Sequence, residues 1–298
     1  MTTINNAPVV LFTYRKRQFL EEIFQAIKSY SPPRLYVVSN LYSSEEERLT
    51  VEAIRHSISQ WQLPGEIIYL FQDQHLLIND SIHNGLDHVF SIEESAIVLE
   101  DDTVPSSSFF DFCNRMLTRY ENAEEIGSII GCNLGASNRE NKAYIVPFAF
   151  FYWGWATWAE KWQTLRNSPL PYGKKDNGVI DKLQNPNSLL TPFFERLDDR
   201  CTWDLRWGWK QALHDMEAII PGKNLVQNKG FVKEGSYIRF TDSSFIKIKA
   251  TDSPTPAKAK KDPVFSRNYE HQSAKLLTEI LTHRGELEKY KMSKSHNS

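Results

Sequence analysis

The segment AIVLEDDTVPSSSFFDF (residues 96–112) decides the fold class of this chain. Its four apolar residues predict a buried strand that runs into three adjacent acids, Glu100, Asp101 and Asp102, and a helical pattern follows at 105–120. Residues two apart in an extended segment point the same way, so Glu100 and Asp102 are expected to share a side. Open parallel sheets bind ligands beyond the carboxyl ends of their strands, which predicts a ligand site here.

The sequence before and after this segment alternates between apolar runs and helical periodicity. We expect strands at 8–14, 35–40, 66–71, 96–102 and 126–134, with helices at 17–30, 43–61, 77–92 and 105–120. Repeated strand–helix–strand units imply right-handed crossovers and a mostly parallel sheet with helices on both faces. The first half is therefore predicted to be an α/β, Rossmann-like fold. At the start of the 105–120 helix, Ser108 and Asp111 have capping-box spacing.

The second half of the chain has a different composition. Aromatic residues crowd 148–162, a helical pattern interrupted near Cys201 spans 189–216, and a Pro-, Lys- and Ala-rich segment at 251–263 predicts a linker. A last helix is expected over 267–290, before a polar tail. We divide the chain into a domain at 1–245, with halves 1–135 and 136–245, and a basic linker, helix and tail at 246–298.

Composition limits the classes of function. The 298 residues are 41% hydrophobic and 24% charged with a net charge of −2, so nucleic acid is not the default partner. Cys113, Cys132 and Cys201 are far apart, which favours free thiols over a zinc site or a disulfide framework. The N-terminus has no signal-peptide pattern, and no window reaches 18 apolar residues. We expect a cytoplasmic protein.

The acid triplet suggests a divalent cation. Adjacent carboxylates repel one another in a partly buried pocket, and a hard cation removes that cost. Mg²⁺ and Mn²⁺ bind one or two carboxylates and take their remaining ligands from water and phosphate oxygens. A solvated turn whose acids favour the N-terminus of the following helix explains the same residues.

Three segments resemble the nucleotide-sugar-dependent glycosyltransferases of the GT-A fold, above all N-acetylglucosaminyltransferase I and its bacterial relatives. They are IVLEDDTVPSSSFFDF (97–112), WGWATWAEKW (153–162) and TWDLRW (202–207), with a weaker match in PVVLFTYRKR (8–17). The resemblance covers roughly residues 8–240 and implies a GT-A fold with an aromatic-rich acceptor half. It also implies an inverting hexosyl- or N-acetylhexosaminyl-transferase of polysaccharide biosynthesis.

The resemblance assigns roles to individual residues. On the donor side, Asp102 would bind Mn²⁺ or Mg²⁺, Glu100 and Asp101 would contact the ribose or the donor sugar, and Arg15 would meet the diphosphate. Relatives often keep an aspartate at the end of the second strand, where this chain has Asn40, whose amide can still pair with a uracil edge. This departure leaves the nucleotide open, with a UDP-sugar as the expected donor.

On the acceptor side, Asp204 would deprotonate a hydroxyl of a glycan or a glycolipid. The resemblance places Trp153, Trp155 and Trp203 against that acceptor. A late segment at 228–240 would close over the donor phosphates through Lys229, Lys233 and Ser236. Each residue also has a structural explanation: Asp204 as a helix cap or first-turn acid, the tryptophans as core, Arg15 as a helix-start residue, and 228–240 as a hairpin.

Two other functions remain open from the sequence. A nucleotidyltransferase of sugar activation has a similar sheet and an acid-bound Mg²⁺, although the basic segment TYRKRQF lacks the glycines usual in its triphosphate loop. A non-catalytic carbohydrate-binding protein would explain the tryptophans but not the acids.

The C-terminal region carries a run of lysines: Lys247, Lys249, Lys258, Lys260 and Lys261. A flexible linker explains them, and so does weak peripheral contact with the inner face of a membrane, because basic residues are attracted to anionic lipids.

Overall fold

The computed structural model describes residues 6–169, 202–230 and 244–283. The first half contains β1 (Val9–Thr13), α1 (Arg17–Tyr30), β2 (Arg34–Ser39), α2 (Glu45–Ser59), β3 (Glu66–Phe71), α3 (Ile78–Val89), β4 (Ser95–Glu100), β5 (Thr103–Pro105), α4 (Ser107–Arg119) and β6 (Ile126–Ile130). The second half contains β7 (Ala143–Val146), β8 (Trp155–Trp158), α5 (Ala159–Asn167), α8 (Trp203–Leu213), β9 (Glu217–Pro221), β10 (Val226–Asn228), a 3₁₀ turn (Ser244–Lys247), β11 (Lys260–Lys261) and α9 (Pro263–His283).

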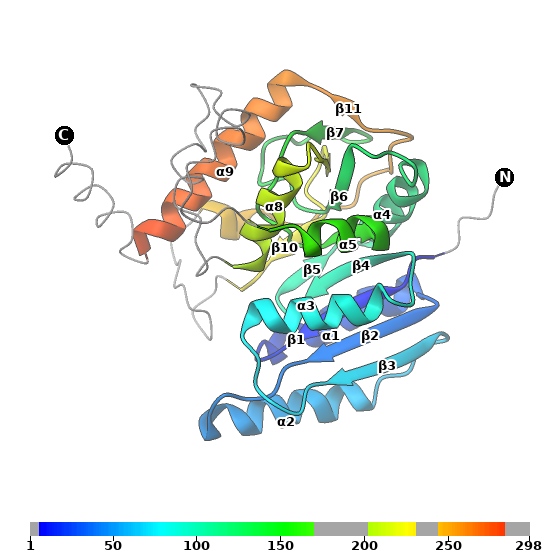
Figure 1. The fold of residues 1–298 in the computed structure, drawn as a ribbon, viewed down its shortest axis with the longest axis vertical. Coiled ribbons are helices and arrows are strands. Elements are labelled where there is room, and N and C mark those ends of the chain that lie inside the picture. Colours follow the sequence, from blue (N-terminus) through cyan, green and yellow to red (C-terminus); the bar gives the residue numbers. More distant parts are fainter. Residues whose placement is uncertain (1–5, 170–201, 231–243, 284–298) are drawn as a thin grey trace.

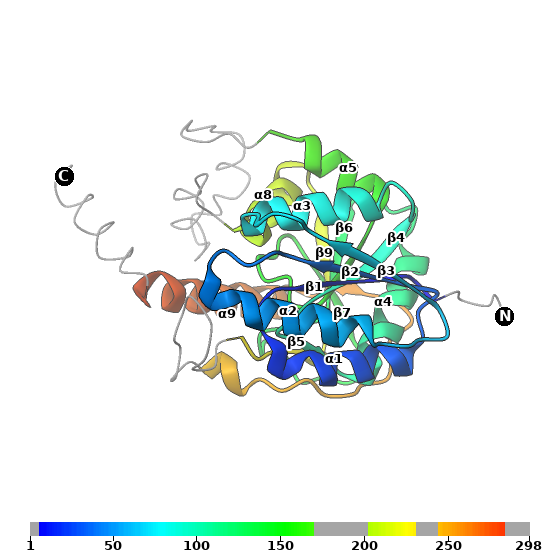
Figure 2. The ribbon, with the colours of Figure 1, turned by 90° about the horizontal axis from the view of Figure 1, so that it is seen from below.

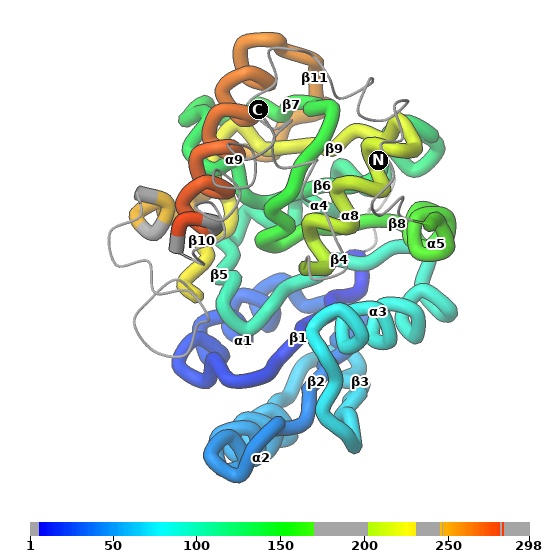
Figure 3. The backbone as a smooth tube through the Cα atoms, turned by 60° about the vertical axis from the view of Figure 1, so that its left-hand side comes forward, coloured from blue at the N-terminus to red at the C-terminus, as the bar shows by residue number. Residues whose placement is uncertain are grey.

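Nine of these strands form one sheet in the order β11-β7-β9-β6-β8-β4-β1-β2-β3. Strands β3, β2, β1 and β4 are parallel neighbours, as are β6 and β9, whereas β8 lies antiparallel between β4 and β6. The predicted α/β fold with a mostly parallel sheet is confirmed. In Figures 1 and 3, α2 and β3 lie at one end of the molecule, and β7, β11 and α9 lie at the other.

Helices cover both faces of the sheet, because its strands alternate their apolar side chains between two cores. In β1, Val9 and Leu11 join the core beneath α1, α2 and α4, while Val10 and Phe12 face the core of α3, α5 and α8. Figure 2 shows the sheet edge-on, with α1, α2 and α4 on one side and α3, α5 and α8 on the other. Loops are thereby left at the ends of the strands.

The segment expected to be a linker is bound to the sheet domain. Strand β11 pairs with β7, and the Thr251 N–H donates to the Asn224 carbonyl oxygen at 2.9 Å. Helix α9 follows and stacks Phe265 on Tyr144, with ring centroids 3.9 Å apart. The division into domains stays a prediction.

The predicted capping box on α4 is wrong. The helix begins at Ser107, and its N-terminus is satisfied by Asp252, whose carboxylate accepts from the Ser107 hydroxyl at 2.8 Å and from the Ser108 N–H at 3.1 Å. The Asp111 carboxylate instead accepts from the Thr255 hydroxyl. A residue distant in sequence therefore supplies the cap.

The expectations about cysteines and about membrane-spanning segments can also be compared with the structure. Cys113 and Cys132 are buried free thiols, as expected, while Cys201 lies outside the described residues. Among the helices of the described ranges, none combines the length and apolarity needed to cross a membrane. The cytoplasmic location stays a prediction.

Candidate functional site

The three acids lie at the carboxyl end of β4, but not along an extended strand. The strand ends at Glu100, and Asp101 and Asp102 form the turn into β5. The expected strand over 96–102 is therefore too long, because β4 ends at Glu100 and alternation along a strand does not orient Asp101 and Asp102. The Thr103 hydroxyl fixes this turn: it donates to the Glu100 carbonyl oxygen at 2.9 Å and accepts from the Glu100 N–H at 2.8 Å.

Asp101 anchors the turn between β1 and α1. Its Oδ2 accepts backbone N–H groups from Tyr14 at 2.7 Å, Arg15 at 3.1 Å and Lys16 at 3.0 Å. Burial nevertheless raises the pKa of Asp101, against the effect of these N–H donors. The structure thus gives Asp101 a local structural role, and its expected contact with the donor stays a prediction.

Asp102 lies against the segment after β10. Strand β10 pairs antiparallel with β5, and the Lys229 N–H donates to the Asp102 carbonyl oxygen at 2.8 Å. Gly230 passes so close that a Cβ atom there would lie 2.0 Å from Asp102 Oδ2, so a larger residue would force the Asp102 carboxylate to move. The expected neighbourhood of the late segment and the acids is present up to Gly230, while Lys233 and Ser236 lie outside the described residues.

Among the described residues, Lys16 brings a positive charge to these acids. Its Nζ donates to the Gly230 carbonyl oxygen at 3.1 Å and lies 3.9 Å from Asp102 Oδ2. The neighbouring Arg15, which is expected to meet the diphosphate, pairs with Glu47, and its guanidinium lies 4.9 Å from the Tyr14 ring centroid. The role of Arg15 stays a prediction.

Asp204 approaches the same site from α8. Burial, followed by the charges of Asp102, Asp204 and Asp101, raises the pKa of Glu100 well above its usual value, against the opposing charge of Lys16. Burial and then Asp101 raise the pKa of Asp102 to about 7, again against Lys16. A residue on α8 therefore acts electrostatically on the end of β4, although the two are about a hundred positions apart.

Packing of α8 sets the position of Asp204. A Cβ atom at Gly208 would lie 2.1 Å from the Ala149 carbonyl oxygen. The glycine therefore allows α8 to pack closely against residues 149–150. Trp203 stacks on Trp155 with ring centroids 5.5 Å apart. Asp204 lies in the first turn of α8, and its Oδ1 accepts from the Leu205 N–H at 3.0 Å. The first-turn position and the acid site are thus compatible.

Several other predicted contacts involve side chains that are already engaged. The Asn40 amide group donates to the Leu76 carbonyl oxygen at 2.8 Å and accepts from the Leu76 N–H at 3.0 Å. Lys229 Nζ donates to Glu22 Oε2 at 2.5 Å. Trp155 and Trp203 are 1% and 4% exposed and belong to the core, while Trp153 is partly buried beside Phe151. Roles for these residues in binding stay predictions.

The acids fit a hard divalent cation. Within the described ranges, no group of three or more His, Cys, Asp or Glu side chains is arranged to hold a metal ion. Mg²⁺ and Mn²⁺ do not need such a group, because water and substrate phosphates complete their coordination. Glu100 and Asp102 offer carboxylate oxygens whose pKa values are raised by burial and then by neighbouring acids, and a bound cation would favour their ionised forms.

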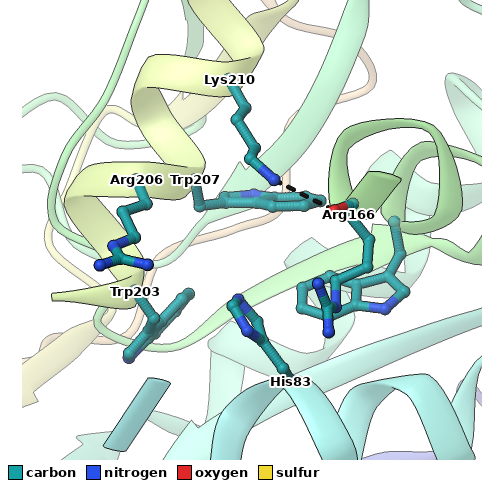
Figure 4. A pocket seen from close by; sticks show the side chains of 7 residues that line it. His83, Arg166, Trp203, Arg206, Trp207 and Lys210 are labelled. Atoms are coloured by element: carbon teal, nitrogen blue, oxygen red, sulfur yellow. Dashed lines mark hydrogen bonds between the residues drawn. The ribbon is translucent and has the colours of Figure 1, made fainter. Parts of the chain in front are cut away.

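A basic cavity of about 150 Å³ lies beside α8. Seven described residues line it: His83, Trp162, Arg166, Trp203, Arg206, Trp207 and Lys210. Figure 4 shows Arg206 and Lys210 descending from α8 toward it and His83 rising from α3. His83 lies within α3, as expected for a helix residue, and the cavity was not predicted from the sequence, although α8 repeats Trp and basic residues at helical spacing.

Comparisons with known proteins give no family. No known family profile matches the chain, and no curated protein matches its sequence. HddC from Yersinia pseudotuberculosis aligns with a TM-score of 0.33 and 10% identity, over 52% of this chain and 77% of that one. A mannose-1-phosphate geranyltransferase from Thermus thermophilus aligns with a TM-score of 0.39 and 12% identity, over 72% and 74%. Neither is named as an N-acetylglucosaminyltransferase, and similarities this weak carry no argument about function.

Proposed function

We propose that the chain is a metal-dependent glycosyltransferase that moves a sugar from a nucleotide-diphosphate donor, a UDP-sugar by preference, to a hydroxyl of a glycan or glycolipid. One observation carries the proposal: Asp204 on α8 contributes to the electrostatic environment of Glu100 at the carboxyl end of β4. This edge of an open sheet is where such folds bind nucleotides. An acid from a separate element there supplies a candidate base beside a candidate metal site.

The donor side of the site is built from β4, the turn after β1, and the segment after β10. Glu100 and Asp102 would hold a divalent cation, which would neutralise charge on the leaving diphosphate when bound. Lys16 adds a positive charge at the same place, 3.9 Å from Asp102. Asp101 keeps the β1–α1 turn, and therefore Lys16, in position through three backbone N–H groups.

The acceptor side depends on Asp204. A carboxylate within hydrogen-bonding reach of a hydroxyl can remove its proton as that oxygen attacks the anomeric carbon. With one such base and no covalent nucleophile, the attack displaces the diphosphate directly and inverts the configuration. The α8 packing holds Asp204 on a rigid element, which general-base catalysis requires.

The test combines a donor screen with an Asp204 variant. Thermal shift with nucleotide sugars, with and without Mn²⁺, should identify one donor that stabilises the protein only with metal. Asp204→Asn should then lower turnover of that donor by about 10²-fold or more, with donor affinity unchanged. Asp215→Asn, just beyond the other end of α8, is the matched control, because asparagine tolerates its positive φ of 54°. Near-normal turnover in the Asp204 variant would reduce that residue to a first-turn acid.

A nucleotidyltransferase of sugar activation is the second candidate. The observation that favours it is Lys16, a cation in the turn directly after β1 that reaches the candidate metal carboxylates. The comparisons with solved structures do not favour the glycosyltransferase over this candidate. Release of pyrophosphate from a nucleoside triphosphate and a sugar 1-phosphate would identify it, whereas a glycosyltransferase releases nucleoside diphosphate. A non-catalytic carbohydrate-binding protein would release neither.

A further inference from the structure

Basic side chains from three helices line the small cavity beside α8. Helix α3 contributes His83, α5 contributes Arg166, and α8 contributes Arg206 and Lys210. None of the described lining residues is acidic. Arg166 Nε lies 3.2 Å from Asp87 Oδ2, and Lys210 Nζ donates to the Arg166 carbonyl oxygen at 3.1 Å. This last bond fixes the Lys210 side chain against the backbone of Arg166 (Figure 4).

The bases in this cavity disfavour one another's charge. Burial, then Arg166 and Arg206, lowers the pKa of Lys210 to about 8. Burial, then Arg166 and Lys210, lowers the pKa of His83 to about 4, with Asp87 opposing. A bound anion would favour the charged forms of Lys210 and His83.

The walls of the cavity strengthen any charge interaction inside it. Trp162, Trp203 and Trp207 are 1%, 4% and 4% exposed, and the Trp162 and Trp207 rings lie 4.9 Å apart between centroids. The Trp207 Nε1 donor is buried without a hydrogen-bond partner. These indole rings give the cavity apolar walls, and a charge-assisted hydrogen bond beside apolar walls is stronger than one at the open surface.

The size of the cavity selects the kind of ligand. About 150 Å³ is below the 300–1,000 Å³ typical of sites for whole small molecules. A cavity of this size can hold one substituent rather than a whole molecule. The basic side chains that line it favour an oxyanion. Arginine and lysine together bind carboxylate and phosphate groups well.

The cavity and the proposed base belong to the same helix. Trp203, Arg206, Trp207 and Lys210 are spaced i, i+3, i+4 and i+7, so they share one face of α8. Asp204 directly follows Trp203, on the neighbouring face. We propose that this cavity binds a carboxylate or phosphate substituent of the acceptor, which makes the acceptor an anionic glycan. The assignment of the bound group to an acceptor rests on the proposed function, whereas the anion site itself does not.

The first experiment measures anion binding by the full chain without donor or metal. Isothermal titration compares inorganic phosphate, glucuronate and glucose at low salt. We expect phosphate or glucuronate to bind and glucose not to bind, and the stronger of the two identifies the substituent. Lys210→Met should weaken that affinity by about 10-fold or more, the scale of a lost charged hydrogen bond. Lys28→Met removes the same charge from an exposed position on α1, across the sheet, and should leave affinity unchanged.

A second measurement needs no variant. Because an anion offsets the charges of Arg166 and Lys210, its binding should raise the pKa of His83, followed by the imidazole NMR signal through a pH titration. The proposal is overturned if neither anion binds more tightly than glucose, or if both lysine variants weaken binding equally. It is also overturned if the anion leaves the pKa of His83 unchanged. Donor stabilisation by Mn²⁺ tests the transferase separately, so either conclusion can fail alone.

Discussion

Replacing Asp102 by asparagine should stabilise the metal-free protein at pH 8 and remove its response to metal. The Asp102 carboxyl has a pKa of about 7, raised mainly by burial and then by Asp101. A carboxyl whose folded pKa exceeds its unfolded value favours the folded state least when ionised, so its cost appears as pH rises from about 4 to 7. Asparagine carries no charge at any pH and avoids this cost.

The magnitude follows from the two pKa values. A change from 3.8 to about 7 corresponds to at most about 4 kcal/mol above pH 7. The Asp102 side chain is 21% exposed, and Glu100 and Asp101 share the same charge burden, so about 2 kcal/mol is the expected gain. For a domain of this size that raises Tm by about 4–8 °C.

Denaturant unfolding in EDTA at pH 4 and pH 8 measures the effect. The variant and the wild type should have equal stability near pH 4 and differ at pH 8, while Mn²⁺ plus donor should stabilise only the wild type. Asp73→Asn, an exposed aspartate after β3, is the control for losing a carboxylate. A pH-independent difference between variant and wild type would refute the unpaired-charge argument, and an intact metal response would refute the metal role.

Three further predictions use other parts of the molecule. Gly230→Ala should displace the Asp102 carboxylate and lower Mn²⁺-dependent donor affinity by about 10-fold or more with the fold retained, and unchanged affinity in titration would contradict the close approach. Although burial opposes them, hydrogen bonds from Ser43 and Tyr14 and the Arg15 charge lower the pKa of Glu47 to about 2, so Glu47→Gln should cost about 2 kcal/mol at pH 7, a difference that disappears as pH falls from 4.5 toward 2 in denaturant melts. The wild type should float with anionic liposomes in a salt-sensitive way, and this flotation should be lost when three exposed lysines are replaced by serine: Lys247, Lys249 and Lys258. Equal flotation of the variant and the wild type would contradict a membrane role for these lysines.

Local patterns were enough to predict the first half of the fold. Helix α1 and strand β3 begin and end at the predicted residues, because the period of their apolar residues is set within each segment. Strand β8 was not predicted within its aromatic stretch, since its antiparallel place between β4 and β6 depends on partners distant in sequence. The 251–263 segment was misread for a related reason: its composition is that of a linker, but its backbone is held by Asn224, Tyr120 and β7.

The candidate site, like the fold, was only partly predictable from the sequence. The acids at the end of β4 could be placed at a ligand-binding edge from strand direction alone, and Asp204 could be proposed only through resemblance. Sequence could not predict where the neighbouring Arg15 and Lys16 side chains lie, because Arg15 pairs with Glu47 and Lys16 donates to the Gly230 carbonyl oxygen, and both partners are distant in sequence. It could not find the basic cavity, because Arg166 and His83 reach α8 only through the packing of α3 and α5.

Helix α8 carries two opposite charges on neighbouring faces, and this arrangement links the two proposals. Asp204 adds negative charge to a site that already holds Glu100, which favours a cation there. Within the described cavity lining, Arg206 and Lys210 belong to a wholly non-acidic set, which favours an anion. Trp203 and Trp207 are buried and form part of the cavity wall on the same helix. A substrate with an anionic substituent and a reactive hydroxyl would be oriented by the same helix that supplies the base.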